Sequence, residues 1–336
     1  MDAFRELETK SSLLVLPPMI LLSGLSDHAT KTIFRMFLVS VFAICLILLC
    51  HAVINAISQG HGFLEFVSGN QYQTTNFTAP LDIHPTYLSL FASLCIFFLI
   101  DNLGNATSRT WIAISIVLAF FFVCINLLLL SRGALIGFSV GAMALIIHKY
   151  WMIRRKYVPV TFAIIGLIGF IATAFALMPN FQYRFADQIR NLKQYWNEYH
   201  PDNSTSLHLH SWKCALELIG ERPVFGYGTG AEVEQLIGCY RQGGFVKSFE
   251  NRYNAHNEFL SSMLNHGIIG IAILVVFFVH SFRMAWHYRD SLLMAVLLLF
   301  LVASCFESTL NVYRGVVFLG LFQPLLVHRL VIQIPS

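Results

Sequence analysis

The chain has 336 residues, of which 56% are hydrophobic and only 12% are charged, and its net charge is +4. Soluble globular proteins carry about 25% charged residues, so this chain has too few charges to cover a water-facing surface. The composition excludes an ordinary soluble protein and predicts an all-α fold, a polytopic bundle of transmembrane helices. The small net charge gives no indication of nucleic-acid binding, and the N-terminus lacks the basic stretch of a secretory signal.

Apolar stretches long enough to cross a membrane, which takes about 20 residues, recur along the chain. We expect five of them before the long polar stretch in the middle of the chain and three after it. They cover 36–57, 85–101, 110–130, 133–150 and 157–178, and then 259–282, 290–308 and 313–332. A shorter apolar stretch at 12–25 is interrupted by Pro17 and Pro18, and we expect a kinked span or a re-entrant piece there.

Most basic residues outside the long polar stretch fall on one side of the membrane if the spans simply alternate. These residues are Lys31, Arg35, Arg109, Lys149, Arg154, Arg155, Lys156, Arg283, Arg289 and Arg329. Because cytoplasmic loops carry an excess of Lys and Arg, that side is predicted to be the cytoplasm. The chain then divides into an N-terminal bundle (1–178), an outer loop (179–257) and C-terminal transmembrane helices (258–336).

The outer loop is water-facing, because it carries eight basic and eight acidic residues. A loop of this length indicates a function or a small subdomain. Its apolar spacing predicts a helix at 209–219 that stops before Pro223, and the sequence Gly-Tyr-Gly-Thr-Gly at 226–230 predicts a tight turn. In an oxidising compartment a disulfide could join its two cysteines, Cys214 and Cys239.

Three arginines at the outer face are candidate ligand-binding residues. Arg132 and Arg314 break the positive-inside pattern in short outer turns, and Arg252 lies just before the span at 259–282. Ionisable groups at membrane depth usually have a partner or a task, and guanidinium groups bind phosphate bidentately. We therefore expect a site for an anionic ligand such as a lipid-linked pyrophosphate. The alternatives are that these side chains reach lipid head groups, or that Arg314 pairs with Glu307 two helical turns earlier.

His256 is the candidate general base. An imidazole with an ordinary pKa of about 6.5 can take a proton from a hydroxyl near neutral pH, and His256 lies in a polar stretch at the start of a span. The alternative is a structural or capping histidine. His84 could contact substrate or cap the helix that Pro85 begins. The sequence has no carboxylate cluster or Cys/His spacing typical of metal sites, so we expect no metal.

Several short motifs follow one another in a distinctive order. They are Ser-Arg-Gly-Ala at 131–134, Trp212 followed by 223–230 in the loop, Asn-Ala-His-Asn-Glu-Phe-Leu at 254–260, and Gly-Ile-Ile-Gly at 267–270. This order, with the topology around the loop, resembles the bacterial O-antigen ligase/polymerase family, the Wzy- and WaaL-like membrane glycosyltransferases. Family members usually have more spans than this chain, so we expect that some N-terminal spans are absent from it.

The resemblance implies a GT-C-like enzyme of the bacterial inner membrane that needs no metal or cofactor. It would transfer a glycan from undecaprenyl pyrophosphate to a hydroxyl at the periplasmic face. The implied acceptor is lipid A-core for an O-antigen ligase, another lipid-linked repeat unit for a polymerase, or a protein hydroxyl in related members.

The resemblance also assigns residues. It places the family's histidine on His256, the arginine of its Ser-Arg-Gly turn on Arg132, and its terminal arginine on Arg314. Four residues before the tryptophan, where the family often has an arginine, this chain has His208. Either His208 contacts the phosphate in its place, or another basic residue such as Arg252 supplies the charge.

Two other classes of function stay open at this point. A transporter of the same lipid-linked glycan would carry charges deep within its spans and an internal repeat between its halves, and neither is clear in the sequence. The chain could also be a non-catalytic partner in an envelope complex.

Overall fold

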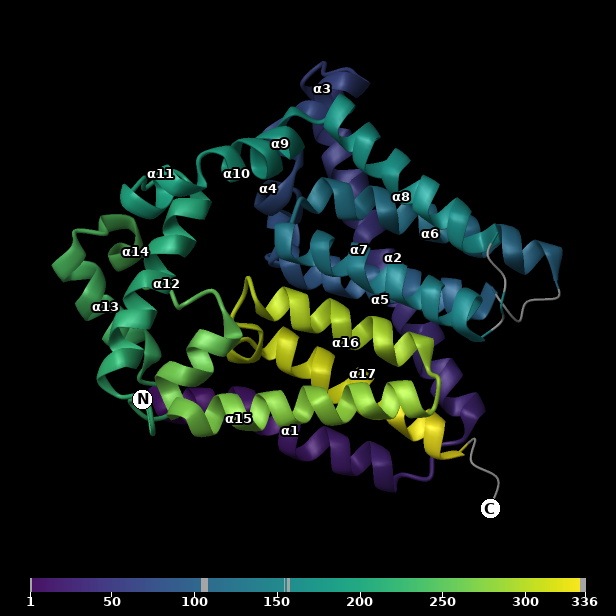
Figure 1. The fold of residues 1–336 in the computed structure, drawn as a ribbon. Helices are drawn as coiled ribbons and strands as arrows, with labels where there is room; N and C mark the ends of the chain where they lie inside the picture. Colours follow the sequence, from purple (N-terminus) through teal and green to yellow (C-terminus); the bar gives the residue numbers. More distant parts are fainter. Residues whose placement is uncertain (1, 104–107, 154, 156–157, 333–336) are drawn as a thin grey trace.

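The computed structural model of the chain describes residues 2–103, 108–153, 155 and 158–332, and every regular element among them is a helix (Figure 1). Within this part of the chain, five helices are long and apolar enough to cross a membrane, as expected for a multi-pass membrane protein. They are α2 (Asp27–Ser58), α5 (Pro85–Leu103), α6 (Arg109–Leu129), α7 (Arg132–Ile146, extended by π turns to Ile153) and α15 (Glu258–His287). Two basic residues used to predict the orientation, Arg154 and Lys156, lie outside the described residues.

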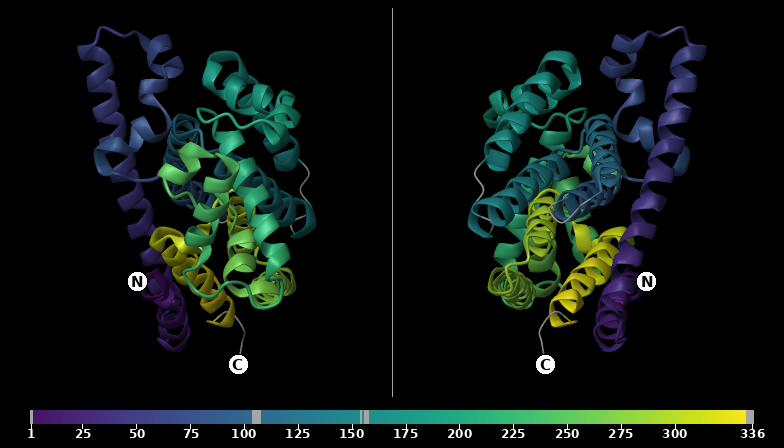
Figure 2. Two further views of the ribbon diagram at one scale, coloured as in Figure 1. Left: turned by 90° about the vertical axis from the view of Figure 1, so that its left-hand side faces the viewer. Right: turned by 90° about the vertical axis from the view of Figure 1, so that its right-hand side faces the viewer.

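Four further helices complete the bundle, and α2 stands along one side of it (Figure 2). These are α1 (Asp2–Leu22), α8 (Val158–Leu177), α16 (Ser291–Ser304) and α17 (Tyr313–Ile332). Helix α1 runs beside α17. Two short helices, α3 (Phe63–Ser68) and α4 (Thr74–Thr78), join α2 to α5.

The outer loop consists of short helices gathered at one end of the bundle (Figure 1). They are α9 (Pro179–Gln182), α10 (Gln188–Arg190), α11 (Leu192–Asn197), α12 (Ser204–Glu221), α13 (Glu232–Gly243) and α14 (Val246–Glu250). The last turn of α5, the first turn of α6 and the turn between α15 and α16 lie at the opposite end of the bundle. The loop therefore covers one face of a membrane bundle.

The centre of the bundle depends on a close contact between α7 and α16. Cβ atoms added at Gly137 and Gly141 would lie 2.9 and 2.8 Å from the carbonyl oxygens of Leu299 and Ala295 on α16. Small residues four positions apart let transmembrane helices approach closely. The contact places the outer end of α7, where Arg132 lies, against the segment that follows α16.

The glycine-rich turn of the outer loop docks on a kink in α15. The kink lies at Gly267, whose φ of 62° and ψ of −153° are not helical. It frees the carbonyl of Leu264, which accepts a 2.8 Å hydrogen bond from the Tyr227 amide. A Cβ atom at Gly267 would lie 2.2 Å from the Val224 carbonyl oxygen, so glycine is required for both conformation and space. The tight turn predicted at 226–230 is confirmed, and it joins the loop to α15.

The outer loop also has a small core of its own. The helix predicted at 209–219 is part of α12, which ends at Glu221, before Pro223 as expected. Cys214 on α12 and Cys239 on α13 are joined by a disulfide. The buried residues of this core are Cys214, Ala215, Leu236, Tyr240, Ala255 and Leu264. The division of the chain at residues 178 and 257 stays a prediction.

The expectation for the first apolar stretch is wrong in its bounds. Pro17 and Pro18 lie inside α1, which is assigned as one helix over Asp2–Leu22 instead of a short piece at 12–25. Prolines are tolerated in membrane helices where neighbouring groups satisfy the freed backbone carbonyls.

The span predicted at 290–308 is also too long. The last residue of α16 is Ser304, and the chain then turns away from the helix axis. The amide of the Asn257 side chain donates a 3.0 Å hydrogen bond to the Cys305 carbonyl, which satisfies a group left over at the helix end. This early stop leaves residues 305–312 free to form part of the outer site.

Gly267→Ala is expected to destabilise the folded chain by about 1–3 kcal/mol, because alanine is strained at positive φ and its Cβ would clash with the Val224 carbonyl. The measurement is thermal unfolding of the purified protein in detergent. Gly238→Ala in α13 is the control, because no atom lies within 4 Å of a Cβ atom there. Equal effects of the two substitutions would contradict the docking of the turn on the kink.

Candidate functional site

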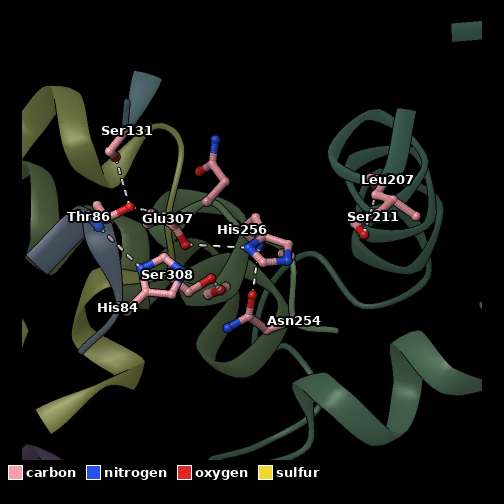
Figure 3. A network of polar contacts seen from close by, with 12 residues as sticks. His84, Thr86, Ser131, Leu207, Ser211, Asn254, His256, Glu307 and Ser308 are labelled. Carbon is pink, nitrogen blue, oxygen red and sulfur yellow. Dashed lines mark hydrogen bonds and ion pairs between the residues drawn. The ribbon is translucent and has the colours of Figure 1, made fainter. Parts of the chain in front are cut away.

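His256 and Glu307 face each other where the outer loop meets the segment after α16 (Figure 3). Nδ1 of His256 and Oε2 of Glu307 are 3.4 Å apart, and the two side chains are 21% and 19% exposed. The φ of His256 is 47°, and its amide donates a 3.0 Å hydrogen bond to Oδ1 of Asn254. Strained backbone of this kind persists only where the surroundings hold it, and it clusters at functional sites. The loop thus presents the imidazole in a fixed position.

The Glu307 carboxyl group is ionised at physiological pH. Burial alone would raise its pKa, but the hydrogen bond with His256 and the field of the neighbouring histidines outweigh burial and lower the pKa to about 2. A carboxylate beside an imidazole orients the ring and stabilises the positive charge that the ring gains when it takes a proton. The pair therefore has the parts of a general base and its orienting partner.

The other oxygen of Glu307 connects the pair to α5 and α7. The Thr86 hydroxyl donates a 3.3 Å hydrogen bond to Oε1 of Glu307 and lies 2.9 Å from Oγ of Ser131. His84 lies beside them, and its Nδ1 accepts a 3.4 Å hydrogen bond from the Thr86 amide (Figure 3). His84 thus caps the start of α5, and it also lines the adjacent cavity.

His208, on α12, stacks on His256 with ring centroids 4.3 Å apart and planes 18° from parallel. Burial, followed by the charge of His256, lowers the pKa of His208 to about 3. His208 is therefore neutral at physiological pH and does not replace the positive charge of an arginine. It can still donate a hydrogen bond, and its ring holds His256 in place.

Two neighbouring cavities lie beside this cluster. The first, of about 180 Å³, is polar, and its wall includes His84, Thr86, Ser131, Arg132, His208 and Glu307. The second, of about 370 Å³, is mainly apolar and runs between α7 and the loop helices α10, α11 and α12. Arg132, His208 and Phe306 line both cavities. These three side chains therefore mark the boundary between a polar chamber and an apolar groove.

Arg132 is the first residue of α7, directly after a sharp turn in which Leu130 has a φ of 46°. Its guanidinium group donates hydrogen bonds to the hydroxyls of Thr205 and, at 3.1 Å, Ser204. Those hydroxyls lie in the first turn of α12, which the Asn203 side chain caps. The N-terminus of α7 adds a partial positive charge at the same place, so this corner of the cavity favours an anion.

The other two candidate arginines lie elsewhere. Arg252 forms an exposed ion pair with Glu234 and does not line either cavity. Arg314, at the start of α17, donates a 3.1 Å hydrogen bond to the Asp82 carbonyl. The alternative that Arg314 and Glu307 share one helix face is wrong, because the chain between them is not a continuous helix.

Glu232, buried at the start of α13, holds the two segments that carry the central pair. Its Oε1 accepts a 2.8 Å hydrogen bond from the amide of Ala255, the residue before His256. Its Oε2 accepts a 2.7 Å hydrogen bond from the side chain of Asn311, four residues after Glu307. Burial raises the pKa of Glu232, and these hydrogen bonds oppose the rise. One carboxylate thereby sets the spacing of both segments.

Sequence reasoning did not assign Glu307, Thr86 or Ser131 to the site. The available signal for Glu307 was an acidic residue at the outer end of an apolar stretch, which we had considered as a partner for Arg314. Thr86 and Ser131 adjoin predicted site residues but carry no signal of their own. Within the described part of the chain, no group of three or more His, Cys, Asp or Glu side chains is placed to hold a metal ion. The site combines an imidazole beside a carboxyl group, the guanidinium group of Arg132 and hydroxyl groups.

Comparison with known proteins supports the family resemblance. Residues 116–275 match the family model described as O-antigen ligase, Wzy_C, which confirms the resemblance predicted from the motifs. The match runs from α6 into α15, so it contains Arg132, His208 and His256 and ends before Glu307.

One relative aligns with most of the chain. An uncharacterized protein of Haemophilus influenzae (strain ATCC 51907 / DSM 11121 / KW20 / Rd) is 25% identical over 277 residues. The alignment covers 82% of this chain and 65% of the relative, so the chain spans less than two thirds of that protein's length.

Glu307→Gln is expected to remove a pH-dependent part of the stability. Folding lowers the pKa of this carboxyl from 4.5 to about 2, so between these values the unfolded chain binds more protons. The contribution, on the order of 3 kcal/mol, is complete above pH 4.5 and is lost as the pH falls toward 2. Thermal unfolding from pH 7 to pH 3 should show the gap between wild type and variant shrinking. With Glu250→Gln, an exposed control, the gap should not change with pH.

Glu232→Ala is expected to destabilise the folded chain by about 2–4 kcal/mol, because it leaves the Ala255 amide and the Asn311 side chain without their acceptor. The free energy of unfolding by a denaturant in detergent is the measurement. Glu234→Ala, two residues along the chain and 53% exposed, is the matched control and should cost less than about 1 kcal/mol. Similar losses for both variants would contradict the role assigned to Glu232.

Proposed function

We propose that this chain, whose residues 116–275 match the O-antigen ligase family, is a membrane glycosyltransferase. It transfers a glycan from undecaprenyl pyrophosphate to an acceptor hydroxyl at the periplasmic face of the bacterial inner membrane. The proposed reaction is that of an O-antigen ligase in lipopolysaccharide biosynthesis, with lipid A-core as the acceptor.

The two cavities suit the two parts of such a donor. The pyrophosphate would lie in the polar chamber, against the guanidinium group of Arg132 and the N-terminus of α7. The polyprenyl chain would lie in the apolar groove between α7 and the loop helices, among side chains such as Ile136, Leu209 and Trp212. Because Arg132 and His208 line both cavities, the charged head and the apolar tail meet at these residues.

The reaction needs one proton transfer and one displacement. The acceptor oxygen attacks the anomeric carbon of the donor glycan, and His256 takes the proton of that hydroxyl while Glu307 stabilises the imidazolium. The bond between the anomeric carbon and the pyrophosphate oxygen breaks, and undecaprenyl pyrophosphate leaves. Arg132 stabilises the negative charge that develops on this leaving group. A metal or cofactor is not required by this scheme.

The observation that carries this proposal is the contact between His256 and Glu307 beside a cavity whose wall contains Arg132. A capping histidine does not need a buried ionised carboxylate as a partner, whereas a general base gains from one. Stacking of His208 on the same ring adds a further constraint on its position.

The remaining candidate residues take supporting roles in this proposal. His84 completes the polar wall near Glu307. Arg314 holds the segment that precedes His84 through the Asp82 carbonyl. Arg252 is paired with Glu234 and would reach the donor only after leaving that carboxylate.

An O-antigen or surface-polysaccharide polymerase is the second candidate, because the matched family does not separate the acceptor classes. A polymerase would use the same base and cation, with another lipid-linked repeat unit supplying the hydroxyl. The products, and not the site chemistry, distinguish the two enzymes.

The test is complementation of a strain that lacks this protein, with surface polysaccharide analysed by gel. His256→Ala, Glu307→Gln and Arg132→Gln should fail to restore the polymer at matched expression. His287→Ala, a histidine exposed at the opposite end of α15, should restore it. With purified protein and lipid-linked donor, His256→Ala should slow transfer by about 10²–10⁴-fold.

The outcomes separate the competing functions. Lipid A-core without a cap indicates a ligase, and chains that stay one repeat unit long indicate a polymerase. Activity of His256→Ala equal to that of wild type would favour a transporter or a non-catalytic partner. Loss of transfer in a chelator, with recovery on adding a divalent ion, would contradict the metal-free mechanism.

A further inference from the structure

A cavity of about 500 Å³ lies at the end of the bundle opposite to His256. It is formed where the π turns that end α7 meet the turn between α15 and α16 (Figure 1). Its polar and aromatic lining consists of His148, Trp151, Arg155, Trp286 and Arg289. None of the described residues that line it is acidic. The cavity is thus a basic, aromatic recess with no function in the proposed transfer reaction.

Its two arginines differ from two other basic residues at this end of the bundle, Lys149 and Arg329. Lys149 contacts Asp101 at 2.6 Å, and Arg329 contacts both Asp290 and Asp101, so these cations are neutralised within the bundle. By contrast, the guanidinium groups of Arg155 and Arg289 have no ion pair or hydrogen bond with any described residue.

The carboxylate next to Arg289 in the sequence, that of Asp290, is not available to these arginines. It is buried, it contacts Arg329, and it accepts a 2.7 Å hydrogen bond from the Leu293 amide as the cap of α16. The positive charge of Arg155 and Arg289 therefore faces a cavity whose described lining has no carboxylate.

The aromatic residues place this recess at the level of lipid head groups. Trp151 and Trp286 are 47% and 58% exposed, and the ring of His148 lies 5.7 Å from that of Trp286. Tryptophan is enriched at the boundary between the hydrocarbon core and water. Helices α7 and α15 continue from the recess into the bundle as apolar, membrane-length segments. A ligand here would have a charged part at the recess and an apolar part along these helices.

We infer that this recess binds the phosphate group of an anionic glycerophospholipid, held by Arg155 and Arg289, with its acyl chains along the exposed faces of Trp151 and Trp286. Guanidinium groups match phosphate oxygens bidentately, and basic pockets between transmembrane helices are known sites for anionic lipid head groups. The inference does not depend on the proposed transfer reaction, because it concerns the other end of the bundle.

The experiment uses tryptophan fluorescence of the full chain in phosphatidylcholine nanodiscs. Two of the five tryptophans line the recess, so phosphatidylglycerol with brominated acyl chains should quench fluorescence more strongly than brominated phosphatidylcholine at the same mole fraction. The excess quenching is the quenching by brominated phosphatidylglycerol beyond that by brominated phosphatidylcholine. In the double variant Arg155→Gln/Arg289→Gln, the mole fraction of phosphatidylglycerol that gives half of this excess quenching should rise about 10–30-fold. Arg109→Gln, an exposed arginine at the same end of the bundle, should behave as wild type.

Two further arms decide the source of the phosphate. Inorganic phosphate in excess should leave the quenching by brominated phosphatidylglycerol unchanged, because the acyl chains contribute to binding. Displacement by inorganic phosphate alone would overturn the lipid assignment. Equal quenching of the double variant and wild type, with unfolding temperatures that also match, would overturn the site itself.

Discussion

Hydrogen bonding of three carboxyl groups at the outer end of the bundle, two of them buried and one half-buried, is the constraint on which the rest of this site depends. Glu232, Glu258 and Glu307 lie on three different segments, and each must find hydrogen-bond donors because an unsatisfied buried carboxylate is costly. Glu232 takes them from Ala255 and Asn311. The other two residues also bond across segments, Glu258 to the Leu310 amide and Glu307 to His256 and Thr86. The end of the loop, the start of α15 and residues 305–311 are thereby fixed to one another.

The position of this hydrogen-bond network also determines the shape of the site. It sits at the boundary between the apolar bundle and the water-facing loop, so a polar chamber and an apolar groove share one wall. Arg132 belongs to that wall because the sharp turn at Leu130 places it at the start of α7 and the hydroxyls of α12 hold its guanidinium group. An amphiphilic substrate with an anionic head matches this arrangement. An entirely water-soluble substrate would occupy the polar chamber and leave the apolar groove empty.

The two ends of the bundle differ in which charged side chains are buried, paired or exposed to a cavity. At the outer end, the carboxyl groups of Glu232 and Glu258 are buried, and Arg132 lies at a cavity. At the opposite end, Lys149 and Arg329 pair with Asp101 and Asp290, while Arg155 and Arg289 face an open recess. The asymmetry agrees with the positive-inside rule for the orientation that we predict. It also fits the chemistry that we propose for the outer end and the lipid contact that we propose for the other end.

The sequence by itself determined the properties that depend on composition and local spacing. Low charge and long apolar stretches predicted the membrane helices, Pro223 predicted the end of α12, and the glycines at 226–230 predicted a turn. The order of short motifs predicted the family, and His256 and Arg132 became candidates through their polar surroundings at helix ends. Each of these features can be recognised within a few residues, because helix propensity, backbone freedom and hydropathy act locally.

Only the tertiary structure decided which residues meet. Glu307 lies 51 residues from His256 and 221 from Thr86, and no local pattern encodes those contacts. Because α16 ends at Ser304, Glu307 contacts the His256 imidazole and does not share a helix face with Arg314. Arg252 forms an ion pair with Glu234. His208 lost its expected charge because its ring is buried against His256. Packing brings these distant groups together, and burial then sets their protonation, so neither property can be determined from sequence spacing alone.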